Sequence, residues 1–261
     1  MSFVQTVLLA GFAGATIYLG LPVGRVRGLS RSWQAALTAA AGGVILFLIY
    51  DVLGQAVEPV RDALSSARAG GSWEPFVTYA FCFAGSVAVG LLSVTYLVSR
   101  MAARAHGTVS ISPRQVAIGT AVGLGLHNFS EGLAIGQSAA TGATAFALIL
   151  VIGFALHNAT EGFAIAAPLG QGDQPSWAFL GGAGVVGGGP TFVGGVLGYS
   201  VVSPVLSIVF LGLAAGALIF VFNEMMTTAR RFSVPMVAGV ALTIGLIAAF
   251  GTDFLLSAAG A

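Results

Sequence analysis

Most of this chain consists of apolar runs long enough to cross a bilayer, separated by short segments that carry nearly all of its charge. Only 7% of its 261 residues are charged and 57% are hydrophobic, with a mean hydropathy of +0.96, whereas a soluble domain carries about 25% charged residues. Apolar runs of about 20 residues predict spanning helices, because a barrel strand needs only about 10 residues of alternating polarity. We therefore expect an all-α integral membrane protein with a single transmembrane domain.

Eight membrane-spanning helices are expected from these runs. They cover about residues 3–23, 33–57, 75–98, 114–138, 142–167, 176–200, 205–228 and 233–257. Most prolines fall near the proposed ends, where a missing N–H costs least. Pro190 alone lies well inside a span, so we expect the sixth helix to be kinked or locally broken there. The first run lacks the basic segment of a signal peptide and is taken as a retained helix.

The arginines indicate how the chain is oriented in a cell inner or plasma membrane. One side of the expected bundle carries Arg25, Arg27, Arg31, Arg100, Arg104, Arg114, Arg230 and Arg231. The opposite side carries only Arg61 and Arg68. The positive-inside rule then predicts that both termini lie outside and that residues 99–113 form a cytoplasmic loop. The net charge of +1 gives no reason to expect nucleic acid as a partner; the lipid bilayer is the expected surrounding.

The most specific pattern is a short phrase that occurs twice, 30 residues apart. It reads Leu-His-Asn-Phe-Ser-Glu-Gly from residue 126 and Leu-His-Asn-Ala-Thr-Glu-Gly from residue 156. Helical residues four apart share a face, so His127 projects with Glu131 and His157 with Glu161. An ionised residue at the bilayer centre costs roughly 2.5–3.5 kcal/mol on insertion scales, which indicates a functional role for these side chains.

Two imidazoles and two carboxylates that converge favour a first-row metal ion. We expect a metal site between helices 4 and 5, formed by His127, Asn128, Glu131, His157, Asn158 and Glu161. The two asparagines either orient the ligands or bind the metal directly. Zinc is our expectation, but these ligands do not select it, since iron, manganese, cobalt and cadmium suit them as well. The absence of thiolate ligands argues against a very tight structural zinc site and favours exchangeable binding.

A second internal repeat links two other spans. Gly43 is followed eight residues later by Asp51, and Gly216 is followed eight residues later by Glu224, within similar apolar runs. Internal repeats are common in secondary transporters, which bind substrate near the membrane midplane. We expect Asp51 in the outer half of its span and Glu224 near the inner end, as pathway acids close to the two mouths.

This set of residues resembles the ZIP (Zrt-, Irt-like protein) family of divalent-metal transporters, of the bacterial type. That family carries His-Asn-x-x-Glu-Gly on its fourth helix and a matching phrase on its fifth. The resemblance implies a main transport site at His127, Glu131, His157 and Glu161, with Asn128 and Asn158 in a neighbouring one. It also implies metal import into the cytoplasm, a homodimer, and an elevator-like motion of the bundle that carries the site. Glu224 resembles the acid at the family's cytoplasmic exit.

Three features depart from the family pattern. Ser130 and Thr160 stand where proline is common, so these two helices are expected to kink less. Gly189 stands where a glutamate often precedes the proline of helix 6, which weakens a second metal position and leaves open whether the site is binuclear. The expected cytoplasmic loop holds one histidine, His106, rather than a cluster, so metal sensing by the loop is not expected.

The leading expectation is a transporter and not an enzyme, with the divalent metal as substrate and no prosthetic group. The alternative is a membrane-embedded metal-dependent hydrolase that uses a metal-bound water. No His-Glu-x-x-His arrangement is present, and the glutamate of each motif is needed for the metal. A proton-linked carrier for another solute, with the two histidines as proton sites, is a third interpretation.

Overall fold

The computed structural model describes residues 1–26, 28–106, 111–171, 174–201 and 203–259. Within these ranges the chain is helical apart from short connections and contains no strand. The elements in order are α1 (Phe3–Ala15), η1 (Thr16–Leu19), η2 (Leu21–Arg25), α2 (Arg31–Arg68), α3 (Glu74–His106), α4 (Pro113–Ala140), α5 (Thr144–Ala166), η3 (Ala167–Gln171), α6 (Trp177–Ser200), α7 (Pro204–Arg230) and α8 (Pro235–Ala259). The expected all-α class is confirmed.

Serine and proline define where most of these helices begin. Five helices follow a serine whose hydroxyl accepts a backbone N–H of the first turn: Ser2, Ser30, Ser112, Ser176 and Ser203. A serine in this position satisfies a donor that the helix itself leaves unpaired. Helices α4, α7 and α8 each start on a proline, whose missing N–H is not needed there.

Seven helical segments within the described residues are long and apolar enough to cross a membrane, and α4 is not one of them. The expectation of eight such spans is therefore supported for only seven. Helix α4 has 28 residues, roughly 42 Å at 1.5 Å per residue, so its length suffices. Its low hydropathy comes from the polar motif and from its many glycines. The other helices bury most of α4, so its polar side chains are kept away from lipid.

Several helix boundaries differ from those expected. Helix α2 continues to Arg68 and contains Pro59, where a span ending near residue 57 was expected. Helix α3 continues to His106, so the first part of the expected loop 99–113 is helical. The first span changes from α-helix to 3-10 helix at Thr16. Helix α6 runs without a break through Pro190, contrary to the expectation of a local break.

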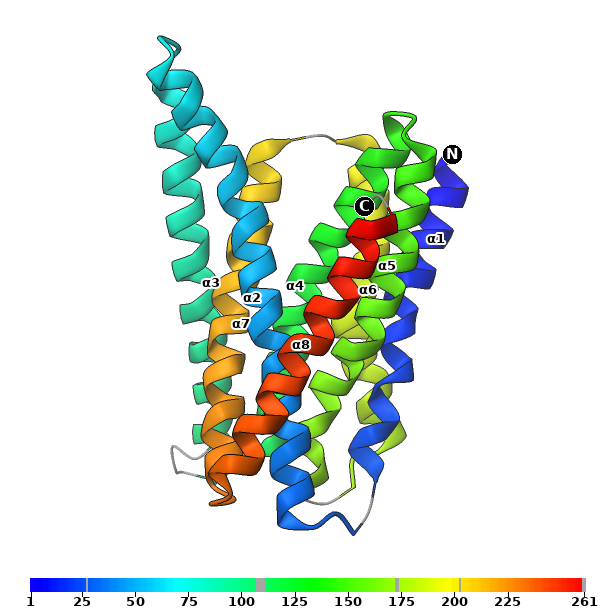
Figure 1. Ribbon diagram of the computed structural model, residues 1–261, viewed down its shortest axis with the longest axis vertical. Helices are drawn as coiled ribbons and strands as arrows, with labels where there is room; N and C mark the ends of the chain where they lie inside the picture. The colour runs from blue at the N-terminus through cyan, green and yellow to red at the C-terminus, as the bar shows by residue number, and fades with distance from the viewer. Residues whose placement is uncertain (27, 107–110, 172–173, 202, 260–261) are drawn as a thin grey trace.

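The two ends of the bundle differ in charge. Figure 1 shows both termini at the same end as the α2–α3, α4–α5 and α6–α7 connections. The other end, called here the arginine-rich end, carries Arg25 and Arg230 at the ends of η2 and α7 and Arg100 in the last turns of α3; Arg27 lies outside the described residues. Trp33 and Trp177 are exposed near that end, as expected for aromatic side chains at a membrane–water boundary. This arrangement suits a multi-pass membrane protein.

Close contacts at glycines divide the helices into two groups. A Cβ added to Gly132 of α4 would lie 2.1 Å from a carbonyl oxygen of α6, and one added to Gly188 of α6 would lie 2.1 Å from a carbonyl oxygen of α1. A Cβ on Gly162 of α5 would lie 1.9 Å from a carbonyl oxygen of η1. Small residues allow helices to approach this closely in membranes. We call α1 with η1 and η2, α4, α5 and α6 the motif bundle.

The remaining helices form a second group, the supporting bundle, in which α2 packs on α8 and α3 on α7. A Cβ added to Gly43 would lie 2.2 Å from the carbonyl oxygen of Leu242, and one added to Gly216 would lie 2.1 Å from that of Val87. Gly43 and Gly216 are the two glycines of the second sequence repeat. They make equivalent contacts with α8 and α3, so this repeat also corresponds to a structural similarity.

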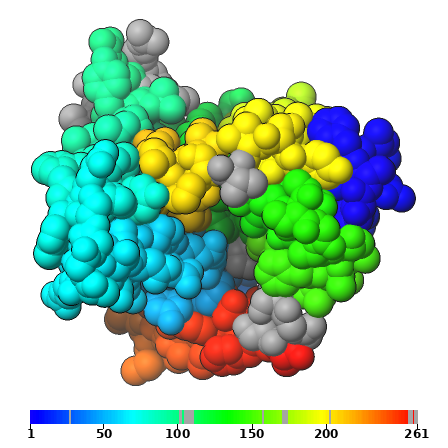
Figure 2. All heavy atoms as spheres, turned by 90° about the horizontal axis from the view of Figure 1, so that it is seen from above, coloured from blue at the N-terminus to red at the C-terminus, as the bar shows by residue number. Residues whose placement is uncertain are grey.

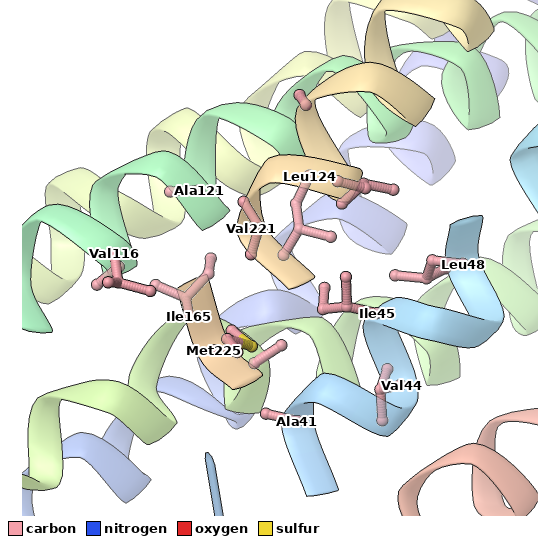
Figure 3. Close-up of a cluster of buried hydrophobic side chains, with 14 of the residues drawn as sticks. Ala41, Val44, Ile45, Leu48, Val116, Ala121, Leu124, Ile165, Val221 and Met225 are labelled. Atoms are coloured by element: carbon pink, nitrogen blue, oxygen red, sulfur yellow. The ribbon is translucent and has the colours of Figure 1, made fainter. Parts of the chain in front are cut away.

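An apolar layer fills the space between the two bundles. It consists of Ile45 and Leu48 of α2, Leu124 of α4, Ile165 of α5, and Val221 and Met225 of α7 (Figure 3). All six side chains are buried. Leu124 precedes the first motif on a helix that starts at the arginine-rich end, and Ile165 follows the second motif on a helix that runs back to it. The layer therefore lies on the arginine-rich side of the doubled motif.

Candidate metal site

The doubled motif lies on two antiparallel helices joined by a tight turn. Helix α4 ends at Ala140 and α5 begins at Thr144, with Gly142 at a φ of +84° between them. Glycine is favoured there because a side chain is strained in this left-handed region. The hairpin brings the middle of α4, with the first motif, beside the middle of α5, with the second.

The glycine that ends each motif fixes how closely its helix packs. Gly132 meets the carbonyl oxygen of Thr191 on α6, and Gly162 meets that of Ile17 on η1. A side chain at either position would push the helix away from its neighbour. The two copies of the motif are therefore held against the bundle by the same kind of contact.

His127 lies between the two glutamates. Its Nε2 is 3.5 Å from Oε1 of Glu131 and 3.8 Å from Oε1 of Glu161. These three side chains are at most 4% exposed. The contact between His127 and Glu131 follows from their i, i+4 spacing, whereas the contact with Glu161 joins the two motifs.

The asparagine of each motif donates a hydrogen bond to the glutamate of the other. Nδ2 of Asn128 lies 2.7 Å from Oε2 of Glu161, and Nδ2 of Asn158 lies 3.2 Å from Oε2 of Glu131. Both asparagines are fully buried. Each carboxylate thus has one oxygen held by an amide from the opposite helix, while its other oxygen is the one close to His127.

The two asparagines are not equivalent. Nδ2 of Asn128 also donates to the carbonyl oxygen of Gly187 on α6, at 3.0 Å. Both neighbours of this nitrogen are acceptors, which fixes the orientation of the amide. Within the described part of the chain, Oδ1 of Asn128 and Oδ1 of Asn158 have no hydrogen-bond partner.

The expected six-residue site is assembled only in part. Five of its members lie together; the side chain of the sixth, His157, is outside the described residues. Among the residues that are described, no three His, Cys, Asp or Glu side chains already form a metal-binding group. Around a four-coordinate ion with bonds of about 2.0–2.2 Å, ligand atoms lie roughly 3.3–3.6 Å apart. The separations of 3.5 and 3.8 Å at His127 are close to that spacing, so small side-chain rotations would bring these groups into a metal's first shell.

Asp51 lies on the side of the motif that faces away from the arginine-rich end. It is within electrostatic range of both Glu131 and Asp253, and its Oδ2 accepts a hydrogen bond from Gln55 at 2.8 Å. An open cavity of about 590 Å³ is lined by Tyr50, Asp51, Leu53, Gly54, Gln55, Val57, Glu58, Arg61 and Asp253. Seen from the end with both termini, the surface is hollowed between α2, α5 and α8 (Figure 2). The proximity of Asp253 to Asp51 could not be foreseen from the sequence, because the two residues lie on different helices.

The second expected pathway acid lies apart from the motif. Glu224 is near the end of α7, half-buried, and within electrostatic range of Arg231. None of the interactions described for it involves a motif residue. It stays a candidate for the inner mouth on the basis of its position alone.

Gly189 does not lie where the resemblance to the ZIP pattern would place a metal ligand. A Cβ added there would meet only Val185, at 3.8 Å, on its own helix, and Val185 is well exposed. The position therefore faces away from α4. On α6 it is Gly187 whose carbonyl oxygen accepts a hydrogen bond from Asn128, and no sequence pattern indicates this contact.

The sequence matches no protein-family model, and no curated protein matches it. Function is therefore inferred from the chemistry of the buried His, Asn and Glu side chains and from the motif that supplies them.

Proposed function

We propose that the protein is a divalent transition-metal transporter of the ZIP type, which moves metal into the cytoplasm with zinc as the favoured substrate. The observation that carries this proposal is the convergence of His127, Glu131 and Glu161 from two helices in a buried position. Two carboxylates side by side in a low-dielectric interior must be offset by a bound cation or by protons. Imidazole with carboxylate oxygen is a ligand set suited to zinc and its neighbours.

The surroundings of the site favour transport over permanent binding. Toward the end with both termini, the open cavity with Asp51 and Asp253 offers an acidic approach to Glu131. Toward the arginine-rich end, the apolar layer blocks the way. If the arginine-rich end is cytoplasmic, this is a state that accepts metal from outside and is closed to the inside.

Release to the inside requires the apolar layer to part. The layer lies between the motif bundle and the supporting bundle, so a displacement of one bundle against the other would open it. This motion corresponds to the elevator-like mechanism that the family resemblance implies. The motif bundle would carry the metal, because all described site residues belong to α4 and α5.

Metal uptake into proteoliposomes tests the proposal. Purified protein would be assayed with zinc, iron(II), manganese and cadmium, alongside His127→Ala and Glu161→Ala. Saturable uptake by wild type and its loss in both variants are expected, because each removes a group at the centre of the site. Asn223→Ala, an exposed amide on α7, serves as the matched control and should transport normally. Stoichiometric metal binding without uptake would refute transport and favour the membrane-embedded hydrolase.

A further inference from the structure

Given the proposed transport function, we infer that Asn128 and Asn158 are positioning residues that prepare the two glutamates for one metal ion, and that they are not ligands of a second ion. The structure gives three reasons: the polarity of the two amides, the oxygens that they leave for the metal, and the charge of the site.

The amide nitrogens, and not the amide oxygens, face the carboxylates. For Oδ1 of Asn128 to reach a metal that is also bound to Glu161, the amide would have to turn over. That turn breaks the hydrogen bonds to Glu161 and Gly187 and places Oδ1 against two other acceptors. In Asn158 the same turn would break the hydrogen bond to Glu131 and place Oδ1 of Asn158 against Oε2 of Glu131. Both asparagines are therefore held as donors.

The other oxygen of each glutamate faces the histidine. Oε2 of Glu131 and of Glu161 accept the amide hydrogen bonds, whereas the two Oε1 atoms lie 3.5 and 3.8 Å from Nε2 of His127. An ion bound between these three atoms keeps both amide hydrogen bonds intact. Outer hydrogen bonds of this kind orient metal ligands and strengthen their binding.

Charge also favours a single ion. Glu131 and Glu161 together neutralise one divalent cation, whereas a second would leave two buried positive charges. Gly189 supplies no further carboxylate and faces away from the motif. Asp51 is within electrostatic range of Glu131, but it belongs to the supporting bundle and is bonded to Gln55.

The two asparagines should differ in how much each contributes to metal affinity. Asn128 makes two hydrogen bonds and links Glu161 to α6, whereas one hydrogen bond is described for Asn158. Loss of an outer-shell partner typically weakens metal binding 10–100-fold. We expect Asn128→Ala to weaken binding about 100-fold and Asn158→Ala about 10-fold, each without changing the number of ions bound.

The test measures zinc and cadmium bound to purified full-length protein by equilibrium dialysis with metal analysis. The number of site-bound ions is the difference between wild type and a Glu131→Gln/Glu161→Gln variant, which removes adventitious binding from the count. One ion per chain in wild type, weaker binding in both asparagine variants, and unchanged binding in Asn223→Ala are expected. The visible spectrum of bound cobalt(II) should change in the asparagine variants, because ligand geometry changes and not only affinity.

Two ions in wild type, with one lost in each asparagine variant, would overturn the inference and leave the transport proposal standing. One ion with unchanged affinity and an unchanged cobalt spectrum in both variants would overturn the positioning role. No bound ion in wild type, together with no uptake, would refute the proposed function itself. The wild-type count decides between one ion and two even if a variant fails to fold.

Discussion

Helix α4 contacts α6 and α7 in different ways. Toward α6 the contact is backbone on backbone: a Cβ added to Gly132 would lie 2.1 Å from the carbonyl oxygen of Thr191, and one added to Gly194 would lie 2.1 Å from that of Phe129. Toward α7 the contact is with side chains: a Cβ added to Gly123 would meet Cβ of Ala217 at 3.3 Å. The first contact allows no side chain, and the second allows a small one.

The same difference separates the two bundles throughout the described residues. At several helical glycines an added Cβ would lie within 3.0 Å of the backbone of another helix. In each of these cases the other helix belongs to the same bundle as the glycine. Helices that share such contacts cannot slide, because a carbonyl group lies in the path of any movement. The seam between the bundles is lined by side chains and lacks these obstacles. From this difference we expect the motif bundle to move as one rigid body against the supporting bundle.

The largest effect is expected from linking the two bundles. In a Cys82→Ser background, Gly123→Cys/Ala217→Cys joins α4 to α7, and Gly24→Cys/Ala166→Cys joins η2 to α5 within the motif bundle. In both pairs the Cβ atoms are 3.3 Å apart before relaxation, close to the 3.5–4.5 Å of a disulfide. Oxidation should abolish metal uptake in the first pair and leave it unchanged in the second.

Uptake assays before and after reduction check this prediction, since reduction should restore transport in the first pair. Equal uptake by both oxidised pairs would mean that transport needs no movement between the two bundles. The difference between the two contacts of α4 would then have no role in transport.

A strong effect on stability is expected from Gly132→Ala. The added methyl group would overlap the Thr191 carbonyl group and force α4 and α6 apart; overpacking of this kind costs about 1–3 kcal/mol. Thermal unfolding in detergent should show a clearly lower midpoint than wild type, and uptake should fall because the motif moves with its glycine. An unfolding midpoint equal to that of wild type would contradict the close contact.

A smaller effect is expected from Gly123→Ala, the same change nine residues earlier on the same helix. The new methyl group would meet Ala217 at 3.3 Å, which a shift of a few tenths of an ångström relieves. The unfolding midpoint should stay near wild type. Uptake should slow a few-fold, because the added methyl group hinders movement of α4 past α7. A stability loss as large as that of Gly132→Ala would show that the two contacts of α4 are alike.

The smallest effect is expected from Gly189→Ala. Its Cβ would meet only Val185, at an ordinary van der Waals distance of 3.8 Å, so only helix propensity changes, which favours alanine by up to about 1 kcal/mol. Metal stoichiometry and uptake should remain as in wild type, measured by dialysis and in proteoliposomes. A change in the number of bound ions would place this position near the metal after all.

The sequence predicted the helical class, the order of the helices and the proximity of five of the six motif residues, because these depend on local periodicity and on a repeated motif. Residues four apart, such as His127 and Glu131, share a face wherever a helix forms. Hydropathy was a weaker guide for α4, since a helix covered by other helices does not need an apolar surface. The extensions of α2 and α3 were missed because polar helical turns beyond the bilayer resemble loops.

Which helix each glycine meets could not be read from one sequence. The partners of Gly132 and Gly162 are distant in the chain, and no local pattern identifies them. The exchange of hydrogen bonds between the motifs was equally hidden, because spacing alone would also permit Asn128 to bind metal. The side of α6 that Gly189 occupies was hidden for a related reason, because its position next to Pro190 does not reveal it.

The hydrogen bonds between the two motifs determine how substitutions in them combine. Glu161 accepts a hydrogen bond from Asn128, and Glu131 accepts one from Asn158. A substitution of the asparagine in either motif therefore releases the carboxylate of the other motif. Substitutions within such a pair should be non-additive, the second adding little once the first has released its partner. The two copies of the motif therefore depend on each other, and neither can substitute for the other.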